Sequence, residues 1–501
     1  MNKHYEQLLP YLERNHAYQA ALALFSWDAE TLAPISASEY TAKYVGILSE
    51  EAYHILICDE VKELLHKLSS KKEYDSLTVS EQAIVRLLQK EYDKMSCIPA
   101  KEYREFSELC AAAHPIYCRA KQTGKFEDFA PTLEKLIDYT RRFASYRAKN
   151  GESLYNILLN DYEEGFTTEV LDDFFSKVRE AIVPLLKKVT EKNNTIDKSY
   201  NISFYPVDIQ SGFCRFLSGY LGFDFNRGVI AESEHPFTTS LHNHDVRITN
   251  HYYSDNLESS MFSAIHETGH ALYEMGVDDS ITGTPAGSGI SMGMHESQSR
   301  FYENMIGRSK DFWIPLFPKL KETYPEELEQ VSLDDFIAGI NKAEPGLIRT
   351  EADELTYPLH ILIRYELEKD IFEGNCNIAD LPKLWAKKYE EYLGVTPDND
   401  GEGILQDIHW ALASFGYFPS YAIGSAIAAQ LYDYLAQRMP LSDYLKEGNL
   451  VPVREYLRDH IHKYGASYPT NELLKQVTGE EFNPDYYIRY LTEKYTTLYH
   501  L

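Results

Sequence analysis

The chain has 501 residues, of which 44% are hydrophobic and 25% charged, values typical of a folded globular protein rather than a disordered chain. Its 77 acidic residues outnumber the 49 Lys and Arg residues, which gives a net charge of −28. A surface this acidic repels nucleic-acid phosphate and anionic lipid. We therefore expect neither nucleic acid nor a membrane among its partners.

The N-terminus and the cysteines predict a cytoplasmic protein. Residues 1–7 are mostly polar or charged, whereas a secretory signal needs an apolar core. A membrane span needs about 20 apolar residues, and the longest candidate, 421–432, is interrupted by Gln430. Six cysteines without a Cys-x-x-Cys pair in a chain of this length indicate reduced thiols rather than a disulfide framework.

Helical periodicity dominates the chain. Apolar residues recur at intervals of three and four within 103–121, 133–146, 171–189, 359–371 and 421–438. Between His235 and Asp255 the apolar residues alternate instead, which predicts a small antiparallel sheet. Residues 191–198 are polar and are predicted to form a loop, but no long linker divides the chain. The pattern favours one mainly α domain spanning 1–501.

The helix predicted after the sheet carries the sequence His266-Glu267-Thr268-Gly269-His270. Residues four apart lie one turn above each other on a helix, so both imidazoles can reach one metal ion. Glu267 can then take a proton from water at the open position of that metal. The pattern predicts a catalytic zinc site, and two helix histidines without an ion are the alternative.

A catalytic zinc needs a third protein ligand. The chain has Tyr273 and Gly276 where metzincins need Gly and His, so that class is excluded. A second helix is predicted to begin near Met294, after a glycine-rich stretch, and it carries Glu296. Two histidines and a glutamate form a known zinc ligand set, so we expect Glu296 to be the third ligand, with His295 as its competitor.

These motifs resemble those of the M32 family of metallocarboxypeptidases, the thermostable carboxypeptidase Taq type. His266–His270 is followed, as in that family, by His295-Glu296-Ser297-Gln298. Further stretches that resemble family motifs are Trp27–Thr31, His235–Phe237, Asp245–Thr249, Ile348–Asp353 and Gly403–Trp410. The resemblance therefore extends over nearly the whole chain.

Membership of this family would imply a mostly helical, saddle-shaped, gluzincin-type fold with a deep central groove beside the small sheet. It would also imply one zinc ion per chain, for which cobalt can substitute, and commonly a homodimer. The activity it implies is the release of C-terminal amino acids from peptides with a free C-terminus, with broad specificity.

Asp245, Arg247 and Thr249 alternate along one predicted strand face just before the metal helix. A strand beside the zinc can align an extended substrate by backbone pairing. The spacing alone favours a solvated hairpin with an Asp–Arg pair, whereas the resemblance favours substrate binding. His242 and His244 are expected to be polar groove or surface residues.

A carboxypeptidase must hold the free α-carboxylate of its substrate, and an arginine does this with two parallel hydrogen bonds. The resemblance makes Arg349 the first candidate and Arg247 the second. Arg349 and Asp353 are four residues apart, so we expect them on one helix face, where Asp353 could orient an arginine or a zinc-bound histidine.

Gln406, His409 and Trp410 recur at intervals of three and four, which predicts one helix face. We expect Gln406 to bind substrate, His409 to donate to the substrate carbonyl or the developing oxyanion, and Trp410 to serve packing. In gluzincins a tyrosine hydroxyl commonly stabilises the oxyanion of the tetrahedral intermediate. Tyr421 is preferred to Tyr417 for that role.

The predicted function is a zinc-dependent metallocarboxypeptidase. An endo-acting or dipeptide-releasing oligopeptidase would share the same zinc ligands, and a catalytically silent peptide-binding protein could keep the same groove. Metal analysis with one assay on free-acid and amidated forms of a peptide distinguishes the three.

Overall fold

The computed structural model describes residues 2–192 and 196–501, which are mostly helical and include one small three-stranded sheet. The predicted mainly α fold is thereby confirmed. The chain forms two compact units. Unit 1 comprises Met1–Ser96, Lys198–Ile340 and Leu431–Glu481, and unit 2 comprises Cys97–Asp197, Asn341–Gln430 and Phe482–Leu501. Each unit has its own buried side chains and is described by itself.

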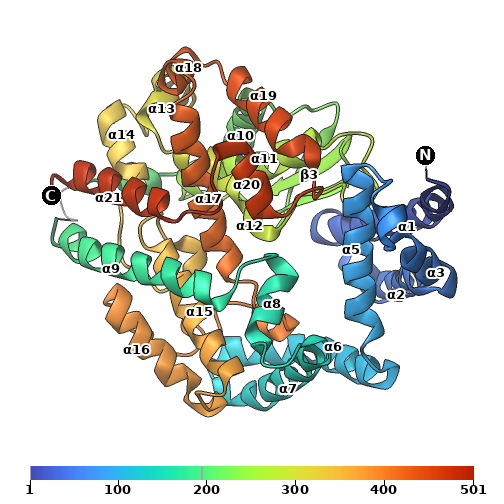
Figure 1. The fold of residues 1–501 in the computed structure, drawn as a ribbon. Helices are drawn as coiled ribbons and strands as arrows, with labels where there is room; N and C mark the ends of the chain where they lie inside the picture. The colour runs from blue at the N-terminus through green and yellow to red at the C-terminus, as the bar shows by residue number, and fades with distance from the viewer. Residues whose placement is uncertain (1, 193–195) are drawn as a thin grey trace. The chain divides into compact units, whose positions relative to one another are not determined.

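Unit 1 contains the sheet and the helices around it (Figure 1). Its helices are α1 (Lys3–Thr31), α2 (Ser38–Ile57), α3 (Asp59–Leu68), α4 (Lys71–Tyr74), α5 (Val79–Ser96), α10 (Val207–Leu221), α11 (Leu257–Gly276), α12 (Met292–Arg300), α13 (Lys310–Thr323), α14 (Leu333–Ile340), α18 (Leu441–Glu447), α19 (Val451–His460) and α20 (Thr470–Thr478). Beyond α12 the helix continues as a π-helical turn over Phe301–Ile306.

The sheet consists of β1 (Gly228–Glu232), β2 (Thr238–His242) and β3 (Asp245–Asn250), in the order β1-β3-β2. β2 pairs antiparallel with β3, as alternation predicted, but β1 pairs with β3 in parallel, so the sheet is mixed. The expectation of a wholly antiparallel sheet is corrected here. β1 precedes the stretch that alternates, and its register with β3 depends on a contact between segments about twenty residues apart, which local periodicity does not report.

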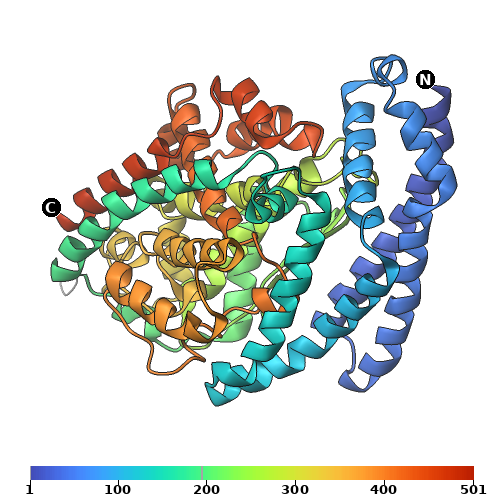
Figure 2. The ribbon, with the colours of Figure 1, turned by 60° about the horizontal axis from the view of Figure 1, so that its bottom comes forward.

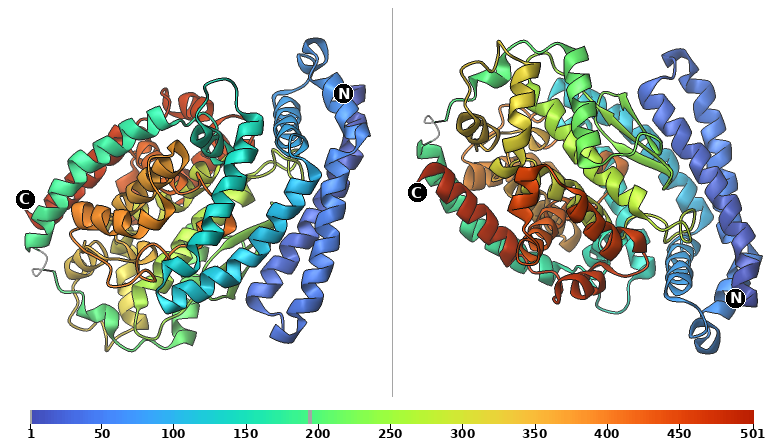
Figure 3. Two further views of the ribbon diagram at one scale, coloured as in Figure 1. Left: turned by 90° about the horizontal axis from the view of Figure 1, so that it is seen from below. Right: turned by 90° about the horizontal axis from the view of Figure 1, so that it is seen from above.

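The sheet packs on α11, the helix that carries the metal motif. Val246 and Ile248 point from β3 into a buried cluster with Ala271 and Met275 of α11, and Phe223 completes it. The right-hand panel of Figure 3 shows the strands beside this helix. Burying the Val, Ile, Phe and Met side chains of this cluster stabilises the packing of the sheet on α11 by roughly 1.5–3 kcal/mol each. The hydrophobic effect therefore fixes where the metal helix lies relative to β2 and β3.

The N-terminal helices form a second apolar cluster in unit 1. Buried residues of α1, α3 and α5, with Leu8, Val61 and Ile84 among them, pack together and enclose Ala286. Figure 2 shows these helices side by side. Ala286 belongs to the loop between α11 and α12, so this cluster holds part of the loop that separates the metal-binding helices.

Unit 2 is helical, and its longest helices confirm the helices predicted from the apolar periodicity. They are α6 (Ala100–Thr123), α7 (Ala130–Arg147), α8 (Leu154–Tyr162), α9 (Thr168–Lys192), α15 (Tyr357–Glu373), α16 (Leu381–Leu393), the first part of α17 (Pro419–Ala436) and α21 (Asp485–Tyr499). The buried face of α9 runs from Leu171 to Val189 as predicted, and α21 packs along this helix (Figures 1 and 2).

The loop predicted at 191–198 lies partly outside the described residues, which resume at position 196. Among the described helices, none is both long enough and apolar enough to cross a bilayer.

Candidate metal centre and substrate-binding residues

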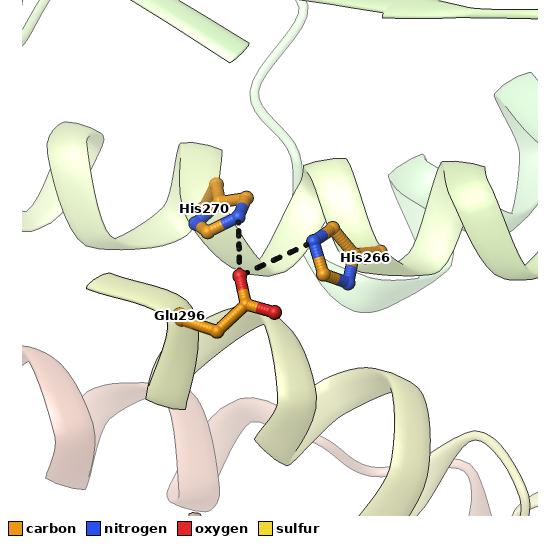
Figure 4. Close-up of side chains that lie close together, drawn as sticks. All are labelled: His266, His270 and Glu296. Carbon is orange, nitrogen blue, oxygen red and sulfur yellow. Dashed lines mark ion pairs between the residues drawn. The ribbon is translucent and has the colours of Figure 1, made fainter. Parts of the chain in front are cut away.

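His266 and His270 lie one turn apart on α11, as their spacing predicts. The Asn256 side chain caps the helix by accepting a hydrogen bond from the Ser259 N–H, which satisfies one of the free donors of the first turn. The two imidazole centroids are 4.8 Å apart. Both rings therefore face the same side of the helix, toward α12 (Figure 4).

Glu296 comes to these histidines from α12, whose N-terminus is capped by the Ser291 hydroxyl. Its Oε2 lies 3.6 Å from Nε2 of His266 and 3.4 Å from Nε2 of His270 (Figure 4). One ligand atom from each of the three residues lies within 4.8 Å of the others. Glu296 Oε1 points the other way and accepts a 2.7 Å hydrogen bond from Arg300 Nε.

The charged groups of this cluster favour a positive charge at its centre. Burial raises the pKa of Glu296, but Arg300 and the two imidazoles outweigh burial and hold that pKa well below its ordinary value. Burial lowers the pKa of His266, but Glu296 and Glu303 outweigh it and raise that pKa. Burial lowers the pKa of His270 to about 3, which leaves a neutral imidazole with a free lone pair. Two nitrogens and a carboxylate oxygen fit a divalent metal such as zinc.

The second ring nitrogens of the two histidines have different partners. Nδ1 of His266 lies 2.8 Å from Oε2 of Glu303, in the π-helical turn after α12. Nδ1 of His270 lies 2.6 Å from Nδ1 of His295, whose Nε2 lies 2.8 Å from Oε1 of Glu274. Both nitrogens of His295 are thus engaged with His270 and Glu274, so the structure groups Glu296, and not His295, with the histidine pair.

Glu267 lies on α11 beside the histidines and is only 6% exposed. Its Oε2 accepts a 2.6 Å hydrogen bond from the Thr238 hydroxyl of β2. Burial raises the pKa of Glu267, which moves this carboxylate toward the range in which a general base works best.

The three β3 residues expected on one strand face, Asp245, Arg247 and Thr249, have different surroundings. Arg247 makes two 2.9 Å contacts with Asp245 and lies over the Trp27 ring at 5.0 Å, which joins two of the quoted motifs. Thr249 is 1% exposed, and its hydroxyl oxygen accepts hydrogen bonds from the Ser233 hydroxyl and the Phe237 N–H. β3 is the middle strand, so its backbone is paired on both sides and an added peptide strand would have to pair with an edge strand.

His242, at the end of β2, and His244, in the turn to β3, lie at the surface of unit 1. His244 Nε2 contacts Asp279 Oδ1 at 2.9 Å, and His242 Nδ1 accepts a hydrogen bond from the His244 N–H. Neither residue belongs to the metal-ligand cluster found among the described residues.

In unit 2, Arg349 and Asp353 do not share a helix face, so that expectation is wrong. Arg349–Glu351 is a short 3-10 turn, and Ala352 after it is extended, which breaks the helical phase. The Asp353 carboxylate instead accepts hydrogen bonds from the N–H groups of Leu355 and Thr356. Asp353 therefore holds the turn before α15.

Arg349 is 7% exposed and is held by charged and aromatic neighbours. Its Nε donates to Asp407 Oδ1 at 2.9 Å, and its Nη1 donates to the Tyr357 hydroxyl at 3.1 Å. Asp407 also pairs with Arg364 at 2.6 Å through its other oxygen. Burial raises the pKa of Asp407, but the two guanidinium groups outweigh burial and hold that pKa well below its ordinary value.

The predicted single helix face at Gln406, His409 and Trp410 is also wrong. Helical turns begin only at His409 and form a short 3-10 segment, because the chain before it turns through Gly403. Gln406 Oε1 accepts from the backbone N–H of Arg349 and from Arg364 Nη2, so its amide is used inside unit 2.

His409 and Tyr421 do come together. Nε2 of His409 lies 3.1 Å from the Tyr421 hydroxyl, and its ring stacks on Tyr417 with centroids 5.4 Å apart. Burial lowers the pKa of His409 to about 4, so the imidazole is neutral near pH 7. The Trp410 indole donates a 2.8 Å hydrogen bond to the buried Glu368, which supports its predicted packing role.

Several residues of these clusters were not predicted from the sequence. Glu303 lies seven residues after Glu296 and Glu274 lies four after His270, so helical spacing could have found both. Thr238 and Arg364 belong to segments distant in sequence from their partners, and no local pattern identifies them.

A helix with the His-Glu-x-x-His motif, joined by a glutamate from the next helix of its unit, defines the metallopeptidase class to which zinc endopeptidases and exopeptidases both belong. Comparison with known proteins narrows the class. The sequence model of the carboxypeptidase Taq (M32) metallopeptidase family matches residues 7–495 of this chain. The chain belongs to this family.

Relatives and solved structures agree with the family match. Carboxypeptidase 1 of Bacillus subtilis (strain 168) is 43% identical over 97% of both chains, and thermostable carboxypeptidase 1 of Thermus thermophilus is 35% identical over 99% of both. The crystal structure of the M32 carboxypeptidase from Deinococcus radiodurans R1 is 32% identical, with a TM-score of 0.96 over 99% of this chain and all of that one. A Pyrococcus furiosus carboxypeptidase structure has a TM-score of 0.94 at 35% identity, over 99% of both chains.

Proposed function

We propose that this metallocarboxypeptidase uses zinc to release C-terminal amino acids, one at a time and with broad specificity, from peptides with a free C-terminus. The observation that supports this most directly is the convergence of His266, His270 and Glu296 within 4.8 Å. Two imidazoles and one carboxylate suit zinc and leave a coordination position open for chemistry. Cobalt, with similar ligand preferences, is expected to substitute.

When bound, zinc would act as a Lewis acid that makes a water molecule acidic enough to lose a proton near neutral pH. Glu267 accepts that proton and later passes it to the amine of the leaving amino acid. The Thr238 hydroxyl holds Oε2 of Glu267, so the other carboxylate oxygen is the one available for the transfer. Arg300 holds Glu296 with Oε2 facing both imidazoles.

We assign the recognition of substrate partly to unit 2. Asp407 contacts Nε and Nη2 of Arg349, and the Tyr357 hydroxyl contacts Nη1. A guanidinium has five N–H donors, enough to bind a substrate carboxylate as well. The Tyr421 hydroxyl, with the neutral His409 beside it, is the proposed donor to the oxyanion. Gln406 would act by holding Arg349 and Arg364.

The sheet residues are proposed to line the substrate path in unit 1. Arg247 stays the second candidate for the substrate carboxylate, since Asp245 and Trp27 hold it with its guanidinium half-buried. Asp245 would orient Arg247, and Thr249 would act by holding the turn before β2 through the Phe237 N–H.

We further propose a homodimer that works in the cytoplasm, with residues 1–501 forming one functional domain. Size-exclusion chromatography with light scattering gives the mass in solution. A particle of about twice the 57.8 kDa chain supports the dimer, and a particle of one chain contradicts it.

The proposed function is tested by metal analysis together with one peptide assay. Purified protein should contain one zinc per chain, and Glu296→Ala should lose zinc at a chelator concentration that leaves the wild type loaded. The loaded wild type should cleave a free-acid peptide at its last bond and leave the amidated form intact. Equal cleavage of both forms favours an oligopeptidase, and binding without cleavage favours a silent peptide-binding protein.

A further inference from the structure

The two metal-ligand histidines differ in the partner of their second ring nitrogen, Nδ1. His266 has a direct carboxylate partner, because its Nδ1 is 2.8 Å from Glu303. His270 has another histidine instead: its Nδ1 is 2.6 Å from Nδ1 of His295. A carboxylate follows only one step further out, where Nε2 of His295 is 2.8 Å from Oε1 of Glu274.

The geometry allows one assignment of protons when a metal is bound. His270 must offer the lone pair of Nε2, which faces Glu296, so its proton is on Nδ1. Nδ1 of His295 must then accept that proton, which places the proton of His295 on Nε2. That N–H donates to Glu274, and an ionised carboxylate can only accept.

The packing around His295 fixes its ring in this orientation. A Cβ atom at Gly289 would lie 2.6 Å from Cδ2 of His295, so the backbone of the loop before α12 lies directly against the ring. The Tyr273 ring lies on His295 as well, with centroids 5.2 Å apart. The Gly289 N–H also donates to Oε1 of Glu274, at 3.3 Å, and this contact ties the acceptor to the same loop.

We propose that His295 and Glu274 form a positioning relay that sets the tautomer and raises the metal affinity of His270. The proposal rests on the proposed metal site and extends it to residues that do not touch the metal. Glu274 makes the His295 imidazole a stronger acceptor for the Nδ1 proton of His270, and His270 becomes a better ligand as a result. The two ligand histidines are thus supported independently, one by Glu303 and the other by this relay.

The test measures zinc dissociation constants by chelator competition on the full-length protein, with the thermal stability of the metal-free form alongside. His295→Phe keeps a ring but removes both hydrogen bonds, and Glu274→Gln keeps an acceptor but removes the charge. Glu258→Gln is the matched control, since Glu258 is a buried glutamate of the same helix that pairs with Lys198 and Tyr200. Outer partners of metal ligands typically contribute about 10- to 100-fold in metal affinity.

We expect His295→Phe to weaken zinc binding about 10- to 100-fold and Glu274→Gln about tenfold, with no change in Glu258→Gln. Because the relay acts in series, Glu274→Gln should add nothing in the His295→Phe background. Glu303→Gln should add its full effect there, since it acts through His266. Zinc affinities of both relay variants equal to that of the wild type would overturn the proposal, and so would additive losses within the relay.

A substitute variant and a second measurement keep the test decisive. If His295→Phe fails to fold, His295→Asn replaces it, because its Oδ1 can still accept from His270 while the shorter side chain cannot reach Glu274; it should then bind zinc as Glu274→Gln does. The visible spectrum of the cobalt form should keep its wild-type intensity in His295→Phe, and a spectrum that shows a lost ligand would make His295 a ligand and overturn the relay. A wild type that binds no zinc would instead contradict the proposed function.

Discussion

At the scale of single residues, Glu267 separates metal binding from turnover. Its carboxylate is held by Thr238 and is not one of the three clustered ligands. Glu267→Gln keeps the shape and can still accept from Thr238, but an amide cannot take a proton from water. We expect unchanged zinc content and a fall in kcat of at least about a hundredfold, the lower end of what proton transfer contributes.

Zinc analysis and steady-state kinetics on one preparation check this prediction. Glu258→Gln, which neutralises another buried glutamate of α11, should keep wild-type kcat. Turnover of Glu267→Gln within tenfold of the wild type would assign the base to another group.

Arg349 is the residue on which exopeptidase specificity is proposed to depend. Hydrogen bonds to a charged group contribute about 1.5–3 kcal/mol, so Arg349→Ala should lower kcat/KM for free-acid peptides roughly ten- to a hundredfold. Amidated peptides should be affected much less. Asp407 keeps Arg364 as a partner in this variant, which limits the structural damage.

The comparison is the ratio of rates on the two peptide forms, with Arg179→Ala as the control. Arg179 pairs with Glu366 in the same unit and has no proposed role with substrate. An equal loss on free-acid and amidated peptides would remove Arg349 from carboxylate binding and make Arg247 the residue to test.

At the scale of elements, the metal centre depends on how closely α11 approaches α12. A Cβ atom at Gly269 would lie 2.7 Å from both the Gln298 carbonyl oxygen and the Ser299 Cα, so the two backbones touch there. Gly269→Ala should push away the helix that carries Glu296. We expect lower thermal stability and weaker zinc binding.

Gly212 in α10 offers a matched control, because nothing lies within 4 Å of the position its Cβ would take. Gly212→Ala should be neutral or should stabilise the protein by about 0.4–1 kcal/mol, through the lower entropy of the unfolded chain. Zinc affinity of Gly269→Ala equal to that of Gly212→Ala would show that α12 does not need this contact.

A buried carboxylate in unit 2 predicts a dependence of stability on pH. Glu368 of α15 accepts hydrogen bonds from the Tyr155 hydroxyl, the Trp410 indole and the Gly416 N–H. Burial outweighs these bonds and raises its pKa from 4.5 to about 7. The folded state therefore binds this proton more tightly than the unfolded state, so the stabilisation is complete below pH 4.5 and is lost as pH rises through about 7.

The side chain introduced by Glu368→Gln has no titratable group, so this variant should not lose stability in this way as the pH rises. At about 1.4 kcal/mol per pKa unit, its stability relative to the wild type should rise by roughly 2–3 kcal/mol between pH 5 and pH 8. Urea unfolding at several pH values measures the difference. Any constant effect of the amide cancels in this comparison. A difference in stability that does not change with pH would show that burial does not raise the pKa of Glu368.

At the scale of the whole molecule, the sequence predicts whatever depends on neighbours along the chain. The buried face of α9 follows from the apolar period, and His266 and His270 share a face because four residues make about one helical turn. The mainly α fold could be predicted for the same reason.

The remainder depends on contacts between distant segments or on where a helix stops. β1 pairs in parallel with β3, and Thr238 reaches Glu267 from another strand, so neither has a local signature. The spacing at Arg349 and at Gln406 predicts a helix in each place. The extended Ala352 interrupts the first of these, and the turns before His409 interrupt the second.

The central claim is that the chain removes one amino acid at a time from a free C-terminus. Mass spectrometry of a mixed peptide pool, sampled over time with zinc-loaded protein, tests it most directly. We predict ladders in which each free-acid peptide shortens by single C-terminal residues, while amidated peptides and samples with Glu267→Gln stay intact. Products cut at internal bonds, or shortened by two residues at a time, would contradict it.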